Sequence, residues 1–209
     1  MSKKILYYLL HGKSCNDRVD NVLNTWGKDV DVIFYSDYED LNKKVYKVTD
    51  KSGYWDLEEK HINGFKFLKN NFLDYEWYFL CDDDTFVNTE KMNEFLKTAK
   101  EDIVYGYLIN CWPNMPFLYY PSGGAGVLIH KSVLNKLIDK LTIKGTKFAD
   151  VTLGLNLIDE NIRISNCEFL HSEKPNHYGI TDENIKKHIT FHHIKTLNEM
   201  QDFYNQCKN

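Results

Sequence analysis

Three consecutive aspartates, Asp82, Asp83 and Asp84, are the residues of this chain best suited to do chemistry. They follow directly after the apolar run Trp77–Cys81, which is typical of a buried strand. Adjacent carboxylates repel one another, so clustering them at the end of a strand is unfavourable unless a cation neutralises them. Ligands of open α/β sheets bind just beyond the carboxyl ends of strands, where a divalent ion could bridge the aspartates to a diphosphate. The simpler alternative is a solvated acidic turn, which the abrupt change from apolar to acidic residues disfavours.

A second feature is the small-residue run Gly123, Gly124, Ala125 and Gly126. Glycines let a backbone approach a ligand closely and leave its N–H groups free, so the run is either a turn or a binding loop. It lacks the lysine-containing pattern of a P-loop. It also lies far beyond the first strand, which the glycines of a dinucleotide-binding fingerprint would follow.

Asp150, in the stretch Phe148–Gly154, is the third candidate. The commoner role for such an aspartate is to cap a helix. If it faces the cleft instead, it is a candidate general base.

The fourth feature is a set of histidines in the last third of the chain, His171, His177, His188, His192 and His193. Imidazole joined to carboxylates would favour a transition metal such as manganese over calcium. On a strand, the adjacent His192 and His193 would point to opposite faces, so only one of them is expected to reach the site. For any single histidine, a structural or surface role is the better expectation.

The elements that must position these residues alternate between strand and helix, which predicts an α/β sheet with helices on both faces. A loop with a short extended piece is expected around Pro113 and Pro116. The predicted strands are Ile5–Leu10, Val30–Tyr35, Lys44–Val48, Trp77–Cys81, Ile103–Leu108, Val127–Ile129, Arg163–Glu168 and Thr190–His192. The predicted helices are Asn16–Trp26 with Asn16 as its cap, Asp56–Asn71, Glu90–Lys100, Lys131–Leu141, Asp150–Glu160 and Leu197–Gln206.

The composition is that of an ordinary globular protein. The 209 residues are 43% hydrophobic and fit one domain, residues 1–209, with one substantial core. The net charge of −4 and the lack of a basic stretch argue against a nucleic-acid partner. The 14 Tyr, 12 Phe and 4 Trp favour an aromatic core, and a cleft whose rings stack on a base or a sugar is the second interpretation.

The five cysteines, Cys15, Cys81, Cys111, Cys167 and Cys207, include no C-x-x-C pair. They are expected to be reduced thiols of a cytoplasmic protein, and Cys81 a core residue. The apolar run at the start of the chain is too short to span a membrane and has no signal-peptide cleavage pattern. A soluble protein without a membrane segment is therefore expected, although a piece of a longer protein would look the same.

Together these features resemble glycosyltransferase family 31, which includes Fringe-like and core 1 β1,3-galactosyltransferase-like enzymes. The resemblance covers about Arg18 to Phe203, and its most specific part is the aspartate run followed by the glycine run. The segments that resemble the family's motifs are Arg18 with Thr25 and Trp26, Phe34–Asp37, Glu76–Val87, Ser122–Gly126, Asp150–Gly154, and Phe191–His193 with Met200.

The resemblance implies a GT-A fold, a UDP-sugar donor, Mn²⁺ (or Mg²⁺) as cofactor, and inversion at the anomeric carbon during transfer to a glycan or glycoprotein acceptor. It implies that about residues 1–108 bind the nucleotide and metal and that about residues 109–209 bind the acceptor. The implied metal ligands are Asp84, Asp82 and His192, and the implied base is Asp150. The implied substrate-binding residues are Asp83, Asp37, Lys60, Gly123, Gly124, Ala125, Gly126 and His171.

The chain departs from the family in several ways. Animal members have a membrane anchor and disulfides, whereas this short chain resembles a compact, soluble version of microbial or viral origin. Ala149 replaces an acid that often precedes the base. Glu173 stands where a Fringe-type histidine would be, which leaves the metal histidine open between His192, His193 and His171.

Two other functions compete with the transferase. The first is a catalytically inactive module that binds a nucleotide sugar or a glycan, although such a module needs no base. The second is a sugar-phosphate nucleotidyltransferase, which would need an N-terminal phosphate loop. His11–Ser14 is only a faint echo of one.

Overall fold

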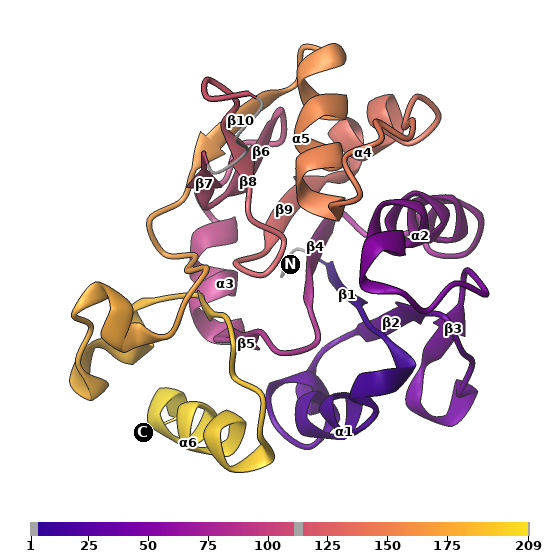
Figure 1. Cartoon of the computed structure of the whole chain (residues 1–209). Coiled ribbons are helices and arrows are strands. Elements are labelled where there is room, and N and C mark those ends of the chain that lie inside the picture. Colours follow the sequence, from indigo (N-terminus) through magenta and orange to yellow (C-terminus); the bar gives the residue numbers. More distant parts are fainter. Residues whose placement is uncertain (1–3, 111–114, 209) are drawn as a thin grey trace.

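The computed structural model describes residues 4–110 and 115–208, and its centre is a seven-stranded sheet (Figure 1). The strands lie side by side in the order β10-β6-β9-β4-β1-β2-β3. In chain order they are β1 (Ile5–Leu10), β2 (Val32–Ser36), β3 (Val45–Lys47), β4 (Trp77–Asp82), β6 (Ile103–Gly106), β9 (Val127–His130) and β10 (Arg163–Asn166).

The direction of β9 determines what the sheet can position. β4, β1, β2 and β3 pair in parallel, whereas β9 pairs antiparallel with β4 on one side and with β6 on the other. The start of β9 therefore lies at the same edge as the ends of β1, β2 and β4. As a result, the glycine run before β9 meets the aspartates after β4.

Both faces of the sheet are buried, because successive strand residues point to opposite faces. In β1, Ile5, Tyr7 and Leu9 belong to one hydrophobic cluster, and Leu6 and Tyr8 belong to the other. The first face packs against α1, α3 and α6, and the second packs against α2, α4 and α5. These helices are α1 (Asp17–Leu23), α2 (Leu57–Asn71), α3 (Thr89–Leu96), α4 (Lys131–Leu137), α5 (Ala149–Asp159) and α6 (Leu197–Lys208).

Two small antiparallel pairs flank the main sheet. β5 (Phe86–Val87) pairs with β11 (Thr190–Phe191), which brings the late histidines back to the aspartates. β7 (Leu108–Ile109) pairs with β8 (Tyr120–Pro121). The predicted loop that contains the two prolines connects these two strands. Short 3₁₀ turns lie at Lys13–Cys15, Trp26–Asp29, Leu41–Lys43, Tyr54–Asp56, Pro175–Tyr178 and Asp182–Lys187.

The predicted α/β sheet with helices on both faces is confirmed. The differences concern the ends of elements and the short pieces that were not predicted, namely strand β5 and the 3₁₀ turns. The first helix ends at Leu23, and the side chain of Asn16 makes no capping hydrogen bond, contrary to prediction. The third helix is capped by Asn88 instead, whose side chain accepts a hydrogen bond from the N–H of Lys91. Pro113 lies outside the described residues, and the prediction of one domain with two functional halves stays a prediction.

No helix in the described part of the chain is both long and apolar enough to cross a membrane. Cys15, Cys81, Cys167 and Cys207 are free thiols, and Cys111 lies outside the described residues. The predicted cytoplasmic location and microbial or viral source stay predictions.

Candidate active site

A polar cleft of about 400 Å³ opens at the carboxyl end of the parallel strands. All three aspartates at the end of β4 line this cleft, together with Arg18, Lys60, His192 and His193. The cleft lies where the topology of an α/β sheet places ligand sites. The structure therefore brings together residues from the start, the middle and the end of the chain.

Asp84, His192 and His193 form a cluster able to hold a metal ion. One ligand atom from each residue lies within 4.8 Å of the others. The His192 Nε2 atom lies 3.0 Å from a carboxylate oxygen of Asp84 and 3.5 Å from one of Asp82. One carboxylate and two imidazoles form a donor set that suits a transition metal such as Mn²⁺, and the residues present fit such an ion.

The backbone holds both histidines against Asp84. The N–H of Ile194 donates a hydrogen bond of 2.9 Å to the carbonyl of Asp84, and the Asn21 side chain donates one of 3.1 Å to the carbonyl of Lys195. Both contacts hold the backbone directly after the histidine pair.

The prediction that only one of the two histidines reaches the site is wrong. The strand β11 ends at Phe191, and His193 has a φ of 64°, in the left-handed region. Because the backbone turns there, the His192 and His193 rings stack with their centroids 3.8 Å apart and do not point to opposite faces. Both side chains thus reach Asp84.

The charges of the cluster are coupled. Burial alone would lower the pKa of His192, but its contacts with Asp82 and Asp84 outweigh burial and raise that pKa to about 10. For Asp84, burial acts in the opposite direction and would raise the pKa of the carboxyl group. The contacts of Asp84 with His192 and Arg18 outweigh burial and lower this pKa below its usual value. Without a metal ion, a protonated His192 therefore supplies part of the positive charge that the aspartates need.

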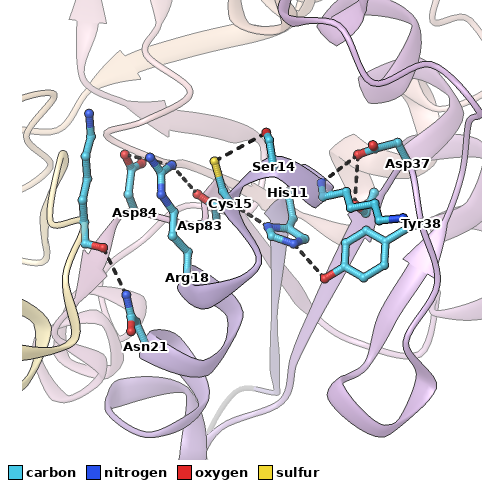
Figure 2. A network of polar contacts seen from close by, with 12 residues as sticks. His11, Ser14, Cys15, Arg18, Asn21, Asp37, Tyr38, Asp83 and Asp84 are labelled. Carbon is cyan, nitrogen blue, oxygen red and sulfur yellow. Dashed lines mark hydrogen bonds and ion pairs between the residues drawn. The ribbon is translucent and has the colours of Figure 1, made fainter.

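Asp83 lies between Arg18 and His11 (Figure 2). One carboxylate oxygen lies 2.6 Å from His11 Nδ1, and the other accepts a hydrogen bond of 2.9 Å from Arg18. The other ring nitrogen of His11 lies 3.1 Å from the Tyr38 hydroxyl. Arg18 also lies 3.3 Å from Asp84, so a protein cation neutralises part of the aspartate run. Asp83 is buried and held by protein groups, whereas Asp84 faces the histidines.

Lys60 and Asp37 meet beside this network. The Lys60 ammonium donates hydrogen bonds of 2.9 Å to Asp37 and 3.2 Å to the carbonyl of His11. Burial acts to raise the pKa of Asp37, but the hydrogen bonds from Lys60 and from the Lys13 N–H outweigh burial and lower it. Lys60 is therefore a buried, paired cation with its ammonium at the cleft.

Asp150 lies in the first turn of α5 rather than at its cap. Its carboxylate accepts hydrogen bonds of 2.9 Å from the Val151 N–H and 3.4 Å from the Gly123 N–H. Burial, helped by the charge of Asp82, raises the pKa of Asp150. Asp150 and Asp82 line one small pocket, and Asp82 also lines the main cleft. Asp82 thus connects the surroundings of Asp150 with the main cleft.

The glycine run links Asp150 to the metal cluster. A Cβ atom on Gly124 would collide with the ring of His192, so only glycine lets that ring lie where it does. Gly126 has a φ of 97°, and a Cβ there would collide with Phe79. The carbonyl of Ala125 accepts a hydrogen bond of 2.7 Å from the Thr190 hydroxyl, which ties the run to β11.

His171 lies apart from these groups, although it was predicted to bind substrate. Its Nε2 lies 2.8 Å from His188 Nδ1, and its ring stacks on Phe191. Burial and the neighbouring His188 lower the pKa of His171 to about 4. It is absent from the lining of the cleft, in keeping with a structural role.

Sequence reasoning missed the parts played by His11, Arg18 and His193. Arg18 belongs to a segment that resembles a family motif, but nothing in that segment indicates a contact with Asp83 and Asp84. The position of His11 just after the first strand was a usable signal, because the ends of adjacent parallel strands meet at one edge.

Comparison with known proteins supports the family resemblance that the sequence motifs indicated. The family model described as Fringe-like matches residues 12–206. A glycoprotein-N-acetylgalactosamine 3-beta-galactosyltransferase 1 from Xenopus laevis is 26% identical over 176 residues, which are 80% of this chain and 46% of that protein. The chain thus spans less than half the length of this curated relative.

Solved structures share the fold. A glycosyltransferase involved in the glycosylation of the major capsid of PBCV-1 superimposes with a TM-score of 0.56 at 14% identity, covering 97% of this chain and 98% of that one. The 4-diphosphocytidyl-2C-methyl-D-erythritol synthase from Anaerococcus prevotii gives a TM-score of 0.52 at 14% identity, covering 79% and 87%. These structures confirm the expected GT-A fold. Because the Fringe-like family model matches most of the chain, the chain belongs to the Fringe-like family.

Proposed function

We propose that this chain is a metal-dependent, inverting glycosyltransferase that moves a sugar from a UDP-sugar to a hydroxyl of a glycan or glycoprotein. One observation carries the proposal. A candidate metal cluster and a carboxylate with a raised pKa lie at the same sheet edge, and one glycine run contacts both. The family assignment and the galactosyltransferase relative support the class of enzyme.

Asp84, His192 and His193 would hold the ion, with Asp82 beside them. We infer Mn²⁺ or Mg²⁺, which when bound would offset the negative charge that develops on the leaving diphosphate. His192 must lose its proton to bind a metal, so binding is expected to strengthen as pH rises. Lys60 and Asp37 are proposed to face the donor on the other side of the cleft.

Asp150 is the proposed base. It would accept the proton of the attacking acceptor hydroxyl while the oxygen forms a bond to the anomeric carbon of the donor. The bond from that carbon to the diphosphate breaks at the same time, and its electron pair leaves with the diphosphate. Attack from the side opposite the leaving group inverts the anomeric centre.

Thermal unfolding with a panel of nucleotides tests the donor and the metal. UDP, GDP, CMP and ADP are each added with and without Mn²⁺, since a ligand that binds only the native state raises the midpoint. A rise confined to UDP with Mn²⁺ is expected. No rise with any nucleotide would contradict the proposal.

Product analysis separates the alternatives. Hydrolysis of a UDP-sugar without acceptor would exclude an inactive binding module. Release of pyrophosphate from a nucleoside triphosphate and a sugar phosphate would instead identify a nucleotidyltransferase.

A further inference from the structure

Two neighbouring aromatic side chains, Tyr54 and Trp55, are exposed, and Tyr54 lines the cleft. The exposed fraction is 64% for Tyr54 and 62% for Trp55. Their ring centroids lie 5.4 Å apart, and both lie near the Phe148 ring, at 6.3 Å and 5.9 Å. We call these three residues the aromatic platform. Rings of this size usually bury most of their surface, so a cluster that keeps so much exposed calls for a ligand.

The platform is built from two segments that a buried carboxylate joins. Tyr54 and Trp55 lie just before α2, and Phe148 lies just before α5. Glu58, in the first turn of α2, accepts hydrogen bonds from the loop that leads into α5. These bonds come from the backbone N–H groups of Lys144 at 2.5 Å, Gly145 at 3.0 Å and Lys147 at 3.2 Å, and from the Thr152 hydroxyl at 2.6 Å.

This carboxylate keeps the loop in place beside the exposed rings. The Lys147 ammonium also lies over the Trp55 ring, 5.6 Å from its centroid. The two segments that carry the rings are therefore held together by hydrogen bonds, and a ligand would bind a preorganised surface.

The platform is continuous with the candidate active site. Tyr54 lines the same cleft as Lys60 and Asp84. Phe148 is the residue directly before α5, and Asp150, the proposed base, lies in the first turn of that helix. The cleft that Tyr54 lines thus connects the platform to the candidate active site.

We propose that the aromatic platform binds a pyranose ring of the acceptor, an inference that rests on the proposed transferase function. A pyranose presents one face of C–H groups, which packs on aromatic rings, and an edge of hydroxyls, which needs polar partners. On the platform, that edge would face the polar groups of the cleft that Tyr54 lines. The donor's phosphates would instead occupy the charged part of the cleft.

Saturation-transfer NMR tests the platform without donor or metal. The probes are methyl glycosides of galactose, glucose, mannose and N-acetylgalactosamine. Saturation transfer to the ring protons of at least one glycoside is expected. Trp55→Ala should weaken its binding about two- to tenfold, and Trp55→Phe should keep most of it. Leu41→Ala is the matched control, because Leu41 is 61% exposed and lies outside the platform.

Nucleotide binding is measured on the same variants by thermal unfolding with UDP and Mn²⁺. An unchanged UDP response together with lost glycoside binding supports the proposal. A weaker UDP response in Trp55→Ala would overturn it, because the rings would then stack on the donor's base. If the wild-type protein transfers saturation to none of the glycosides, the proposal is also overturned. A normal UDP response in the same sample would then show that the proposed donor site is intact and that only the platform proposal has failed.

Discussion

At the scale of single residues, neighbouring aspartates have acquired different surroundings. Asp83 is bound by His11 and Arg18, whereas Asp84 faces two histidines. The same residue type therefore fixes the cleft at one position and offers ligand atoms at the next.

Asp84→Asn is expected to abolish the Mn²⁺-dependent rise in unfolding midpoint with UDP, because the amide removes the anionic ligand of the cluster. Asp50→Asn serves as control, since the Asp50 carboxylate is exposed and pairs only with Lys47. Metal titration followed by thermal unfolding makes the comparison. A full response in Asp84→Asn would mean that the ion binds elsewhere.

Asp150→Asn is expected to retain UDP binding but to slow sugar transfer by about a hundredfold to ten-thousandfold, the usual effect of losing a general base. Asp159→Asn, near the other end of the same helix, is the matched control. Transfer rates at saturating donor test this expectation, and full turnover in Asp150→Asn would exclude it as the base.

The location of the aspartate run at the end of a buried strand was predictable because its signal is local: a switch from apolar to acidic residues within a few positions. The positions of His11, Arg18 and His193 were not, because they depend on contacts between distant segments. For His193 the left-handed backbone decided the outcome, and neither residue type nor period reveals that conformation.

At the scale of elements, the glycine run lies between Asp150 and His192, and it can do so only because its backbone approaches these side chains closely. The strands and helices were predictable from hydrophobic periodicity, whereas their ends depended on individual hydrogen bonds such as that of Asn88.

Gly124→Ala is expected to displace the His192 ring, because the added methyl group would occupy its place. The affinity for Mn²⁺ should fall more than the stability does. Gly179→Ala is the control: a Cβ there meets nothing within 4 Å, whereas its φ of 67° strains the backbone, so this variant is expected to lose stability without a change at His192. Metal titration of both variants, with urea unfolding, separates the two effects. Equal losses of affinity would contradict the role of Gly124.

Glu58→Gln is expected to lower the free energy of unfolding by about 1–3 kcal/mol, because a carboxamide cannot accept all the hydrogen bonds that the carboxylate accepts. Glu59→Gln is the control, since Glu59 only pairs with Lys51 at the surface. Urea unfolding gives the change in stability, and hydrogen exchange at residues 144–147 locates it. Unchanged protection of that loop would show that Glu58 does not hold it.

At the scale of the whole molecule, one sheet collects residues that are widely separated in the chain. Its order was not predictable from the sequence alone, since periodicity identifies strands but does not give their neighbours. The antiparallel strand β9 shows this limit, because its apolar sequence resembles the sequences of the parallel strands in the same sheet.

Global stability is expected to fall as the pH decreases from about 6.5 toward 4. Burial lowers the pKa of His61 and of His171 to about 4 each, whereas an unfolded histidine titrates near 6.5. Between these values the unfolded chain binds protons that the native chain does not, which favours unfolding. Urea unfolding at pH 7 and pH 5 measures the difference.

His61→Gln should reduce this pH dependence, and the exposed His177→Gln should leave it unchanged. The same dependence in wild type and His61→Gln would show that burial of His61 is not its source.

The hydrogen bond between Ile194 and Asp84 also has a consequence for biosynthesis. While the chain emerges from the ribosome, its first half can pair β1, β2 and β4 and expose the acidic edge of the sheet. His192 and His193 are then not yet made, so no nascent intermediate of that length carries the complete cluster. Arg18 and His11, both translated early, are the groups available to shield Asp83 in the meantime. The order of translation thus separates the pairing of the strands that carry the aspartates from the arrival of the two histidines of the candidate metal cluster.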